Sequence, residues 1–244
     1  MSLRITLATA RRVLAQLRHD PRTIAMLIVV PCVLLALLSW IFDGTPTFDR
    51  IGAPLLGVFP FVVMFLVTSI ATLRERTSGT LERLLTMPIG KLDFLLGYAI
   101  AFGLVAVVQA VTATTLAVTL LGLDVAGPVW LLMLVAVLDA LLGMSLGLFV
   151  SAFAATEFQA VQFMPAFVLP QFLLCGLLVA RDEMNDVLRW ISDVLPLSYA
   201  VDAMNELTAR EEVDPRVWAD LSVVGLAMLL ALALGAATLR RRTP

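Results

Sequence analysis

The stretch PVWLLMLVAVLDALLGMSLGLFVSAF, residues 128–153, decides the fold class of this chain. It carries a single charged residue, Asp139, near its middle. A helix needs about 20 apolar residues to cross the hydrocarbon core of a bilayer, and this stretch exceeds that length. Only helices and closed barrels satisfy all backbone polar groups in lipid, so the sequence predicts a membrane-spanning helix and an all-α fold.

The rest of the chain is similarly apolar. Of its 244 residues, 60% are hydrophobic and 15% are charged, whereas soluble domains average about 45–50% apolar and about 25% charged residues. We therefore predict one polytopic membrane domain over residues 1–244. The fifth expected span contains Pro165 and Pro170, so it should be kinked or broken. The six predicted transmembrane helices are 24–42, 52–73, 94–121, 128–153, 158–179 and 217–239.

The distribution of charge indicates the orientation. Most of the 17 basic residues lie before the first span, between the second and third spans, and after the sixth. Cytoplasmic segments are the ones enriched in Lys and Arg, so we expect both termini to be cytoplasmic. Residues 181–220 carry ten of the 19 acidic residues and fall on the outer side. Helical spacing within 180–216 predicts one or two short helices at the outer membrane face.

The first 20 residues are expected to form an amphipathic helix. Apolar residues recur three and four positions apart, at Leu3, Leu7, Ala10, Leu14 and Leu17. Arginines recur every seven positions on a neighbouring flank, at Arg4, Arg11 and Arg18. This pattern is typical of a basic helix lying in the cytoplasmic headgroup region, with these arginines at the membrane interface. A helix packed on protein has the same pattern, so that alternative stays open.

Asp139 is the most unusual residue of the predicted spans. A charge at the centre of a bilayer costs about 2.5–3.5 kcal/mol on insertion scales, so the carboxyl group should face a partner or a water-filled path. Candidate partners at similar depth are Gln109 and the neighbouring threonines, Thr112 foremost. Asp139, Gln109 and Thr112 could therefore line a translocation pathway, or Asp139 could be a coupling residue. A protonated or hydrogen-bonded packing carboxyl is the alternative, and both remain open.

Patterns typical of catalysis or cofactor binding are missing from the sequence. The single histidine is His19, and the two cysteines, Cys32 and Cys175, lie inside apolar runs. There is no HExxH motif and no pair of cysteines in a CxxC arrangement. A GxxxxGK[ST] sequence is also missing, so no P-loop for ATP is expected on this chain. We therefore expect neither a cofactor nor a metal on it, and no nucleic-acid partner.

The polar segment RERTSGTLERLLTMP, residues 74–88, lies between the second and third spans on the cytoplasmic side. Ser78 and Gly79 can start a helix, and Pro88 would end it. Leucines at positions 81, 84 and 85 form one apolar stripe. A helix over 78–87 has about ten residues and is too short to be stable alone in water. Headgroups, the bundle or a groove on a partner must hold it, and the spacing does not choose among them.

Two motifs in this order resemble the permeases of ABC type-2 transporters, the drug-resistance and nodulation-type exporters. Residues 75–88 match the pattern E-x-x-x-G-T-x-E-x-L-x-x-x-P of that family's coupling segment. The later stretch with Trp190, Pro196-Leu197-Ser198-Tyr199 and Asp202-Ala203 is similar to the family's outer segment. The resemblance covers nearly the whole chain and implies that the helix at 78–87 is a coupling helix.

The resemblance also implies a transport subunit rather than an enzyme. A separate ABC ATPase would bind ATP and magnesium, and a second permease copy or a sister permease would complete the pathway in a bacterial-type inner membrane. The implied cargo is a hydrophobic or amphipathic drug or lipid. The alternatives are a permease for a lipid-linked glycan or polysaccharide, and a non-transporting membrane enzyme or scaffold. The implied ATPase-docking residues are Glu75, Gly79, Thr80, Leu81, Glu82, Arg83, Leu84 and Pro88.

Overall fold

The computed structural model describes residues 2–77 and 91–238 of the chain. Within these residues the fold is all-α, with nine α-helices, one short 3-10 helix and no strand. The expected all-α class is therefore confirmed. The elements are α1 (Leu3–Arg18), α2 (Pro21–Ile41), α3 (Thr47–Thr77), α5 (Lys91–Thr119), α6 (Val129–Val150), α7 (Glu157–Leu174), η1 (Arg181–Glu183), α8 (Asp186–Val194), α9 (Pro196–Ala209) and α10 (Pro215–Thr238).

Five of the described helices are long and apolar enough to cross a membrane: α2, α3, α5, α6 and α10. α7, which corresponds to the fifth predicted span, is not among them, because its 18 residues include two prolines and three glutamines. It nevertheless runs as one unbroken helix through Pro165 and Pro170. It begins at Glu157, which pairs with Arg74 of α3. It ends at Leu174, whose carbonyl oxygen accepts a hydrogen bond from Ser192 of α8. The six-span topology stays a prediction.

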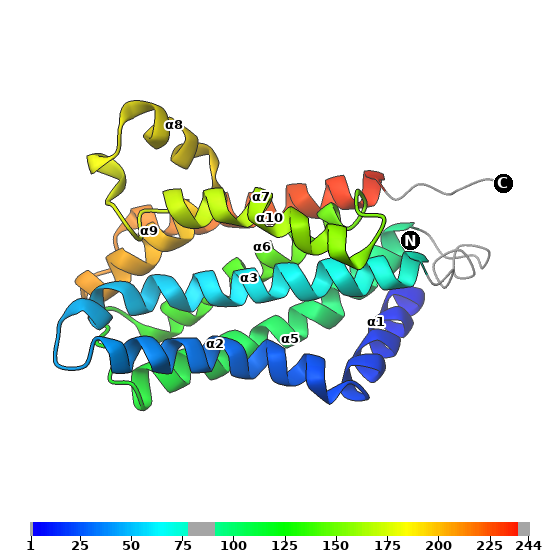
Figure 1. The fold of residues 1–244 in the computed structure, drawn as a ribbon, viewed down its shortest axis with the longest axis horizontal. Coiled ribbons are helices and arrows are strands. Elements are labelled where there is room, and N and C mark those ends of the chain that lie inside the picture. The colour runs from blue at the N-terminus through cyan, green and yellow to red at the C-terminus, as the bar shows by residue number, and fades with distance from the viewer. Residues whose placement is uncertain (1, 78–90, 239–244) are drawn as a thin grey trace.

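The helices form an elongated bundle with two distinct ends (Figure 1). α1, the C-terminal end of α3 and the C-terminal end of α10 lie at one end. α8 and α9 lie at the other, and α8 projects sideways from the body of the bundle. Short helices are present in the segment 180–216 as η1, α8 and α9, at the end opposite the N-terminal helix, and their place at the outer membrane face stays a prediction.

α6 lies at the centre of the bundle and crosses α3 at very close range. A Cβ atom added at Gly147 would lie 2.5 Å from the carbonyl oxygen of Phe65 on α3. A Cβ at Gly143 would overlap the carbonyl oxygen of Phe61. The hydroxyl of Thr68 donates across this crossing to a carbonyl oxygen of α6 at 3.2 Å. Small residues four positions apart thus allow the two backbones to touch, as this pattern does in membrane helices generally.

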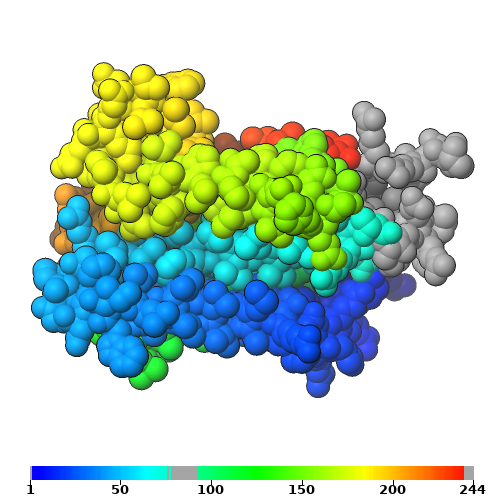
Figure 2. Space-filling model, viewed as in Figure 1, coloured from blue at the N-terminus to red at the C-terminus, as the bar shows by residue number. Residues whose placement is uncertain are grey.

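The peripheral helices leave large apolar surfaces uncovered. In the most apolar window of α2 only 17% of residues are buried, and in that of α10 only 22%, against 61% in α3 and 67% in α6. Figure 2 shows α2, α3 and α7 as adjacent bands across one face of the molecule. Exposed side chains such as Trp40 on α2 and Leu226 on α10 suit contact with lipid or with another membrane chain.

α1 packs on the bundle through part of the apolar stripe in the sequence, since Ala10 and Leu17 are buried whereas Leu3 and Leu7 are not. Leu3 and Leu7 are 71% and 50% exposed, because the helix turns two threonines toward α5 instead. The alternative of a helix packed on protein is therefore realised for this face. Arg4, Arg11 and Arg18 all remain exposed, and their place at a membrane interface stays a prediction. The buried residues of α1 are Thr6, Thr9, Ala10, Val13 and Leu17.

Candidate functional site

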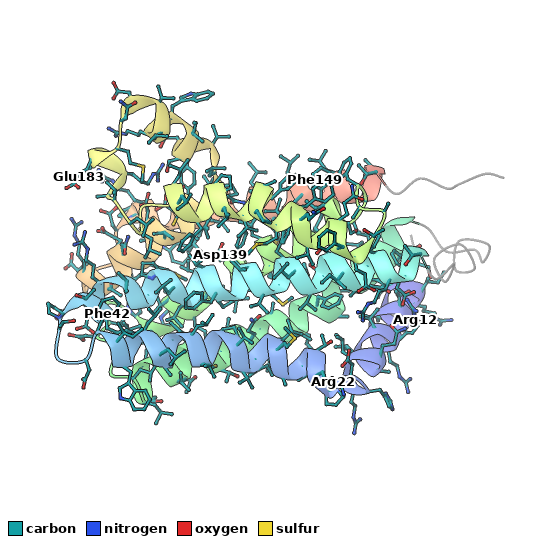
Figure 3. All side chains as sticks on the ribbon, in the orientation of Figure 1. Arg12, Arg22, Phe42, Asp139, Phe149 and Glu183 are labelled. Atoms are coloured by element: carbon teal, nitrogen blue, oxygen red, sulfur yellow. The ribbon has the colours of Figure 1, made fainter. Side chains whose placement is uncertain are left out.

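The C-terminal end of α3 carries a polar cluster that joins three helices. Arg12 of α1 donates to both carboxylate oxygens of Glu75, at 3.1 and 3.3 Å, and Gln16 donates to one of them at 3.2 Å. Arg12 also donates to the hydroxyl of Tyr98 on α5 at 3.1 Å. The Glu75 side chain is only 11% exposed, so the pair is largely shielded from water. We call Arg12, Gln16, Glu75 and Tyr98 the Glu75 cluster; Figure 3 labels Arg12 at this end of the bundle.

α1 also holds the beginning of α5. Asp93 accepts a hydrogen bond from the backbone N–H of Ser2 at 2.9 Å and one from the hydroxyl of Thr6 at 3.3 Å. Gly97, one turn further along α5, allows Thr9 to lie against the helix backbone, since a Cβ at Gly97 would be 2.6 Å from that of Thr9. α1 is thus bonded to the chain on both sides of the segment 78–90.

The segment 78–90 itself lies outside the described residues. Glu75 is therefore the one predicted docking residue whose surroundings the structure gives. The predicted docking residues that fall outside are Gly79, Thr80, Leu81, Glu82, Arg83, Leu84 and Pro88.

Next to the Glu75 cluster, Arg74 ties α3 to the start of α7. Its guanidinium group donates to the two carboxylate oxygens of Glu157 at 2.7 and 3.1 Å. The hydrogen bond from Arg74 holds the pKa of Glu157 below its ordinary value. Both side chains are more than half exposed, so water screens the pair and its contribution to stability is small.

The predicted pathway residues do not form one hydrogen-bonded group. Asp139 and Gln109 are both buried, and within the described residues neither has a hydrogen-bond partner for its side chain. The hydroxyl of Thr112 donates to the carbonyl oxygen of Val108 in its own helix at 2.7 Å. Gln109 and Thr112, the polar partners that we expected for Asp139, therefore make no hydrogen bond to it in this arrangement.

A cavity of about 900 Å³ opens at the end of the bundle that carries α8 and α9. Arginines and carboxylates from several elements line it, including Arg50, Asp124, Arg189 and Arg216. Such a mixed lining favours water and polar groups over apolar cargo. Among residues 2–77 and 91–238, no three His, Cys, Asp or Glu side chains come together as a metal site.

Arg181 organises this end of the molecule. Its guanidinium group forms ion pairs with Asp193 of α8 and Asp202 of α9, and it lies 5.1 Å above the ring of Tyr199. Burial alone would lower the pKa of Arg181, but the two carboxylates raise it above its ordinary value. Tyr199 in turn donates to the carbonyl oxygen of Asp193 at 2.6 Å. These contacts hold α8 against α9.

The comparison with known families agrees with this architecture. The family model described as ABC-2 type transporter matches residues 4–207, which is most of the chain. The chain belongs to the ABC-2 type transporter family. It is accordingly a multi-pass membrane protein, and the resemblance noted in its motifs is confirmed.

Curated relatives carry permease or transporter names. The ABC-2 chain is 27% identical over 147 residues to the probable multidrug ABC transporter permease YbhS of Escherichia coli, covering 60% of this chain and 39% of the relative. It is 25% identical over 167 residues to YbhR of the same organism, covering 68% and 45%. It is 24% identical over 162 residues to ABC transporter G family member 20 of Dictyostelium discoideum, covering 66% and 22%. The chain thus spans less than half the length of each of these relatives.

Sequence reasoning about this ABC-2 chain found Glu75 but missed its partners. Arg12 directly follows one of the arginines that recur every seven residues and does not belong to that series. This departure was the one feature of the sequence that could have indicated a separate role for Arg12. Gln16 follows it by four residues, which places both side chains on one face of α1. Nothing in the sequence marked Tyr98 as part of the cluster. Tyrosines are common near the ends of membrane helices, where the ring lies at the level of the lipid headgroups.

Proposed function

We propose that this chain is the membrane-spanning permease subunit of an ATP-driven exporter in a bacterial-type inner membrane. One observation carries the proposal, namely the family match over residues 4–207, which includes both the segment 74–88 and the outer helices. The names of the Escherichia coli relatives support a drug-like, hydrophobic or amphipathic cargo. Both termini would be cytoplasmic, in keeping with the basic charge of α1.

A separate ABC ATPase would bind ATP and magnesium and would dock on the segment 78–88. The Glu75 cluster supports this part of the proposal, since it fixes the chain directly before that segment to α1 and α5. Asp93, directly after it, is fixed to α1 as well. A movement imposed on the docking segment would therefore reach several helices at once rather than bend a free loop.

A second permease copy or a sister permease would complete the pathway. The largely uncovered faces of α2 and α10 offer surface both for that neighbour and for lipid. The role of Asp139, Gln109 and Thr112 in the pathway stays a prediction. In the arrangement seen here Asp139 and Gln109 are buried and Thr112 is half-buried.

The docking assignment can be tested by co-purification. The double variant Gly79→Trp with Glu82→Lys, expressed with an ABC ATPase that co-purifies with the wild-type chain, should lose that ATPase on an affinity column. The variant itself should elute as a single peak, which size-exclusion chromatography checks before the pull-down is interpreted. Asp43→Lys, an exposed change at the opposite end of the bundle, is the matched control and should retain the ATPase. Equal recovery of the ATPase with all three chains would exclude docking on this segment.

A further inference from the structure

Asp139 lies in the middle of α6 with its side chain fully shielded from solvent. Its exposed fraction is 0%, and among the described residues neither carboxyl oxygen has a hydrogen-bond partner. Gly57 of α3 is directly opposite, since a Cβ atom there would lie 2.8 Å from Oδ2 of Asp139. Met204 of α9 reaches the same point, with its Cε 3.0 Å from that Cβ position. Figure 3 shows Asp139 at mid-bundle, far from the labelled arginines at the end.

No positive charge in the described chain faces this carboxyl group. On α9 the charged residues nearest in sequence to Met204 are Asp202, which is paired with Arg181, and Glu206, which is paired with Arg210. Cys175, the residue after α7, is buried in the core that also contains Ala136 and Leu142 of α6, and a thiol carries no positive charge. α10 contributes Asp220, another acid, and its one described basic residue, Arg216, lines the cavity at the end of the bundle.

The remaining neighbours of α6 have their charges at their ends. On α3, the described charged residues are Asp49 and Arg50 at one end and Arg74 and Glu75 at the other. On α5, Asp93 and Tyr98 lie at the end where α1 packs. An ionised Asp139 would therefore be an unpaired charge in an apolar site, which is strongly unfavourable, whereas the neutral acid is tolerated there.

We propose that Asp139 is a proton-binding site whose protonation is coupled to the packing of α3, α6 and α9. In the arrangement seen here Asp139 holds the proton as a carboxylic acid. When the three helices separate and water reaches the side chain, its O–H bond breaks, the proton passes to water and the carboxylate remains, stabilised by hydration. The coupling concerns the packing of this chain and requires neither the ATPase partner nor a particular cargo.

The packing around Asp139 explains why water cannot reach it without helix movement. Gly57 leaves no side chain between the two helices, so the carboxyl group rests on the backbone of α3. One turn along α6, Gly143 touches the carbonyl of Phe61, which fixes the spacing of the same two helices. Helices in such close backbone contact shift between discrete arrangements rather than deforming continuously.

The direction of the pH effect follows from the proton count. The packed arrangement binds one proton more than the open one, so acid favours the packed arrangement and alkali favours the open one. Over the pH range in which the open arrangement is ionised and the packed one is protonated, the equilibrium constant between them changes about tenfold per pH unit. An Asp139→Asn variant carries no titrating group here and should lose this dependence.

Infrared spectroscopy tests the protonation directly. The full chain in lipid nanodiscs, with aspartate carboxyl carbons labelled with ¹³C, should show at pH 7 a carbonyl band of a protonated acid that shifts with the isotope. Asp139→Asn should lack this band, and Asp43→Asn, an exposed change, should retain it. A wild-type spectrum at pH 7 without a protonated aspartate band would overturn the proposal.

Hydrogen–deuterium exchange tests the coupling. After correction for the intrinsic effect of pH, peptides from α3 and α9 should exchange faster at pH 9 than at pH 6 in the wild-type chain. The difference should vanish in Asp139→Asn. No pH-dependent change in the wild-type chain would overturn the coupling, and this result requires no variant to fold. Since neither measurement includes the ATPase, a failed docking experiment and a failed proton site are distinguishable.

Discussion

At the scale of single residues, the ion pair between Arg12 and Glu75 is the most important contact between α1 and the rest of the bundle. Both side chains make more than one polar contact, and Glu75 is nearly removed from water. A charged hydrogen-bonded group that loses its partner while buried destabilises the protein by much more than a surface charge does. The cluster therefore fixes α1 to the bundle in one register.

A double-mutant cycle on this pair gives the first prediction. Glu75→Gln and Arg12→Gln should each destabilise the chain by about 1.5–3 kcal/mol, because each leaves a polar group in the cluster without its ionic partner. The double variant should lose clearly less stability than the sum of the losses in the two single variants, since the second change removes no further ion pair. Thermal unfolding in detergent, monitored by size-exclusion chromatography, measures the change in stability of each variant.

The control for the cycle is Arg11→Gln, which changes an exposed arginine next to Arg12. It should alter stability by no more than about 0.5 kcal/mol. If the effects of Arg12→Gln and Glu75→Gln added without coupling, the two side chains would act independently and the cluster would not be a unit.

At the scale of helices, the sequence predicted most elements to within a few residues. The sixth predicted span, 217–239, is observed as Pro215–Thr238, and the fourth, 128–153, as Val129–Val150. The fifth ends about five residues early, at Leu174 rather than 179. Gly176 adopts a left-handed conformation with φ of 95°, which turns the chain toward η1, and its apolar neighbours concealed this in the sequence.

The crossing of α3 and α6 provides the second prediction. Gly143→Ala places a methyl group against the backbone carbonyl of Phe61, which cannot rotate away, so the helices must separate. Overpacking of this kind costs about 1–3 kcal/mol. The apparent melting temperature of the purified chain should fall accordingly.

Gly225→Ala on α10 is the matched control, because a Cβ there has no atom within 4 Å. It changes the same residue type within a helix and should be neutral or stabilising by about 0.5–1 kcal/mol, since alanine favours the helix. Equal losses of stability from both variants would show that the close approach at Gly143 is not what limits stability.

At the scale of the whole molecule, the path of α7 decides how often the chain crosses the membrane. α7 starts beside Arg74 at one end of the bundle and ends beside α8 at the other. Its 18 residues extend about 27 Å, close to the thickness of the hydrocarbon core. Its geometry thus suits a sixth span even though its composition is less apolar than that of the other five.

Cysteine labelling in intact cells gives the third prediction. In a chain with Cys32→Ala and Cys175→Ala, an impermeant maleimide should label Thr45→Cys and Asp186→Cys from outside. Ala155→Cys, two residues before α7, should react only after the cells are permeabilised, because six crossings place the two ends of α7 on opposite sides. Labelling of positions 155 and 186 from the same side would contradict the six-span topology.

The sequence alone determined that this is a helical membrane protein, where its helices lie and to which family its motifs point. These properties depend on local composition and spacing, because lipid forces an apolar stretch of sufficient length to be a helix. It did not determine which residues of α1 face α5, that Arg12 and Gln16 hold Glu75, or that Asp139 lies against Gly57. Those contacts join residues far apart in the chain, and only the close packing of the helices brings them together.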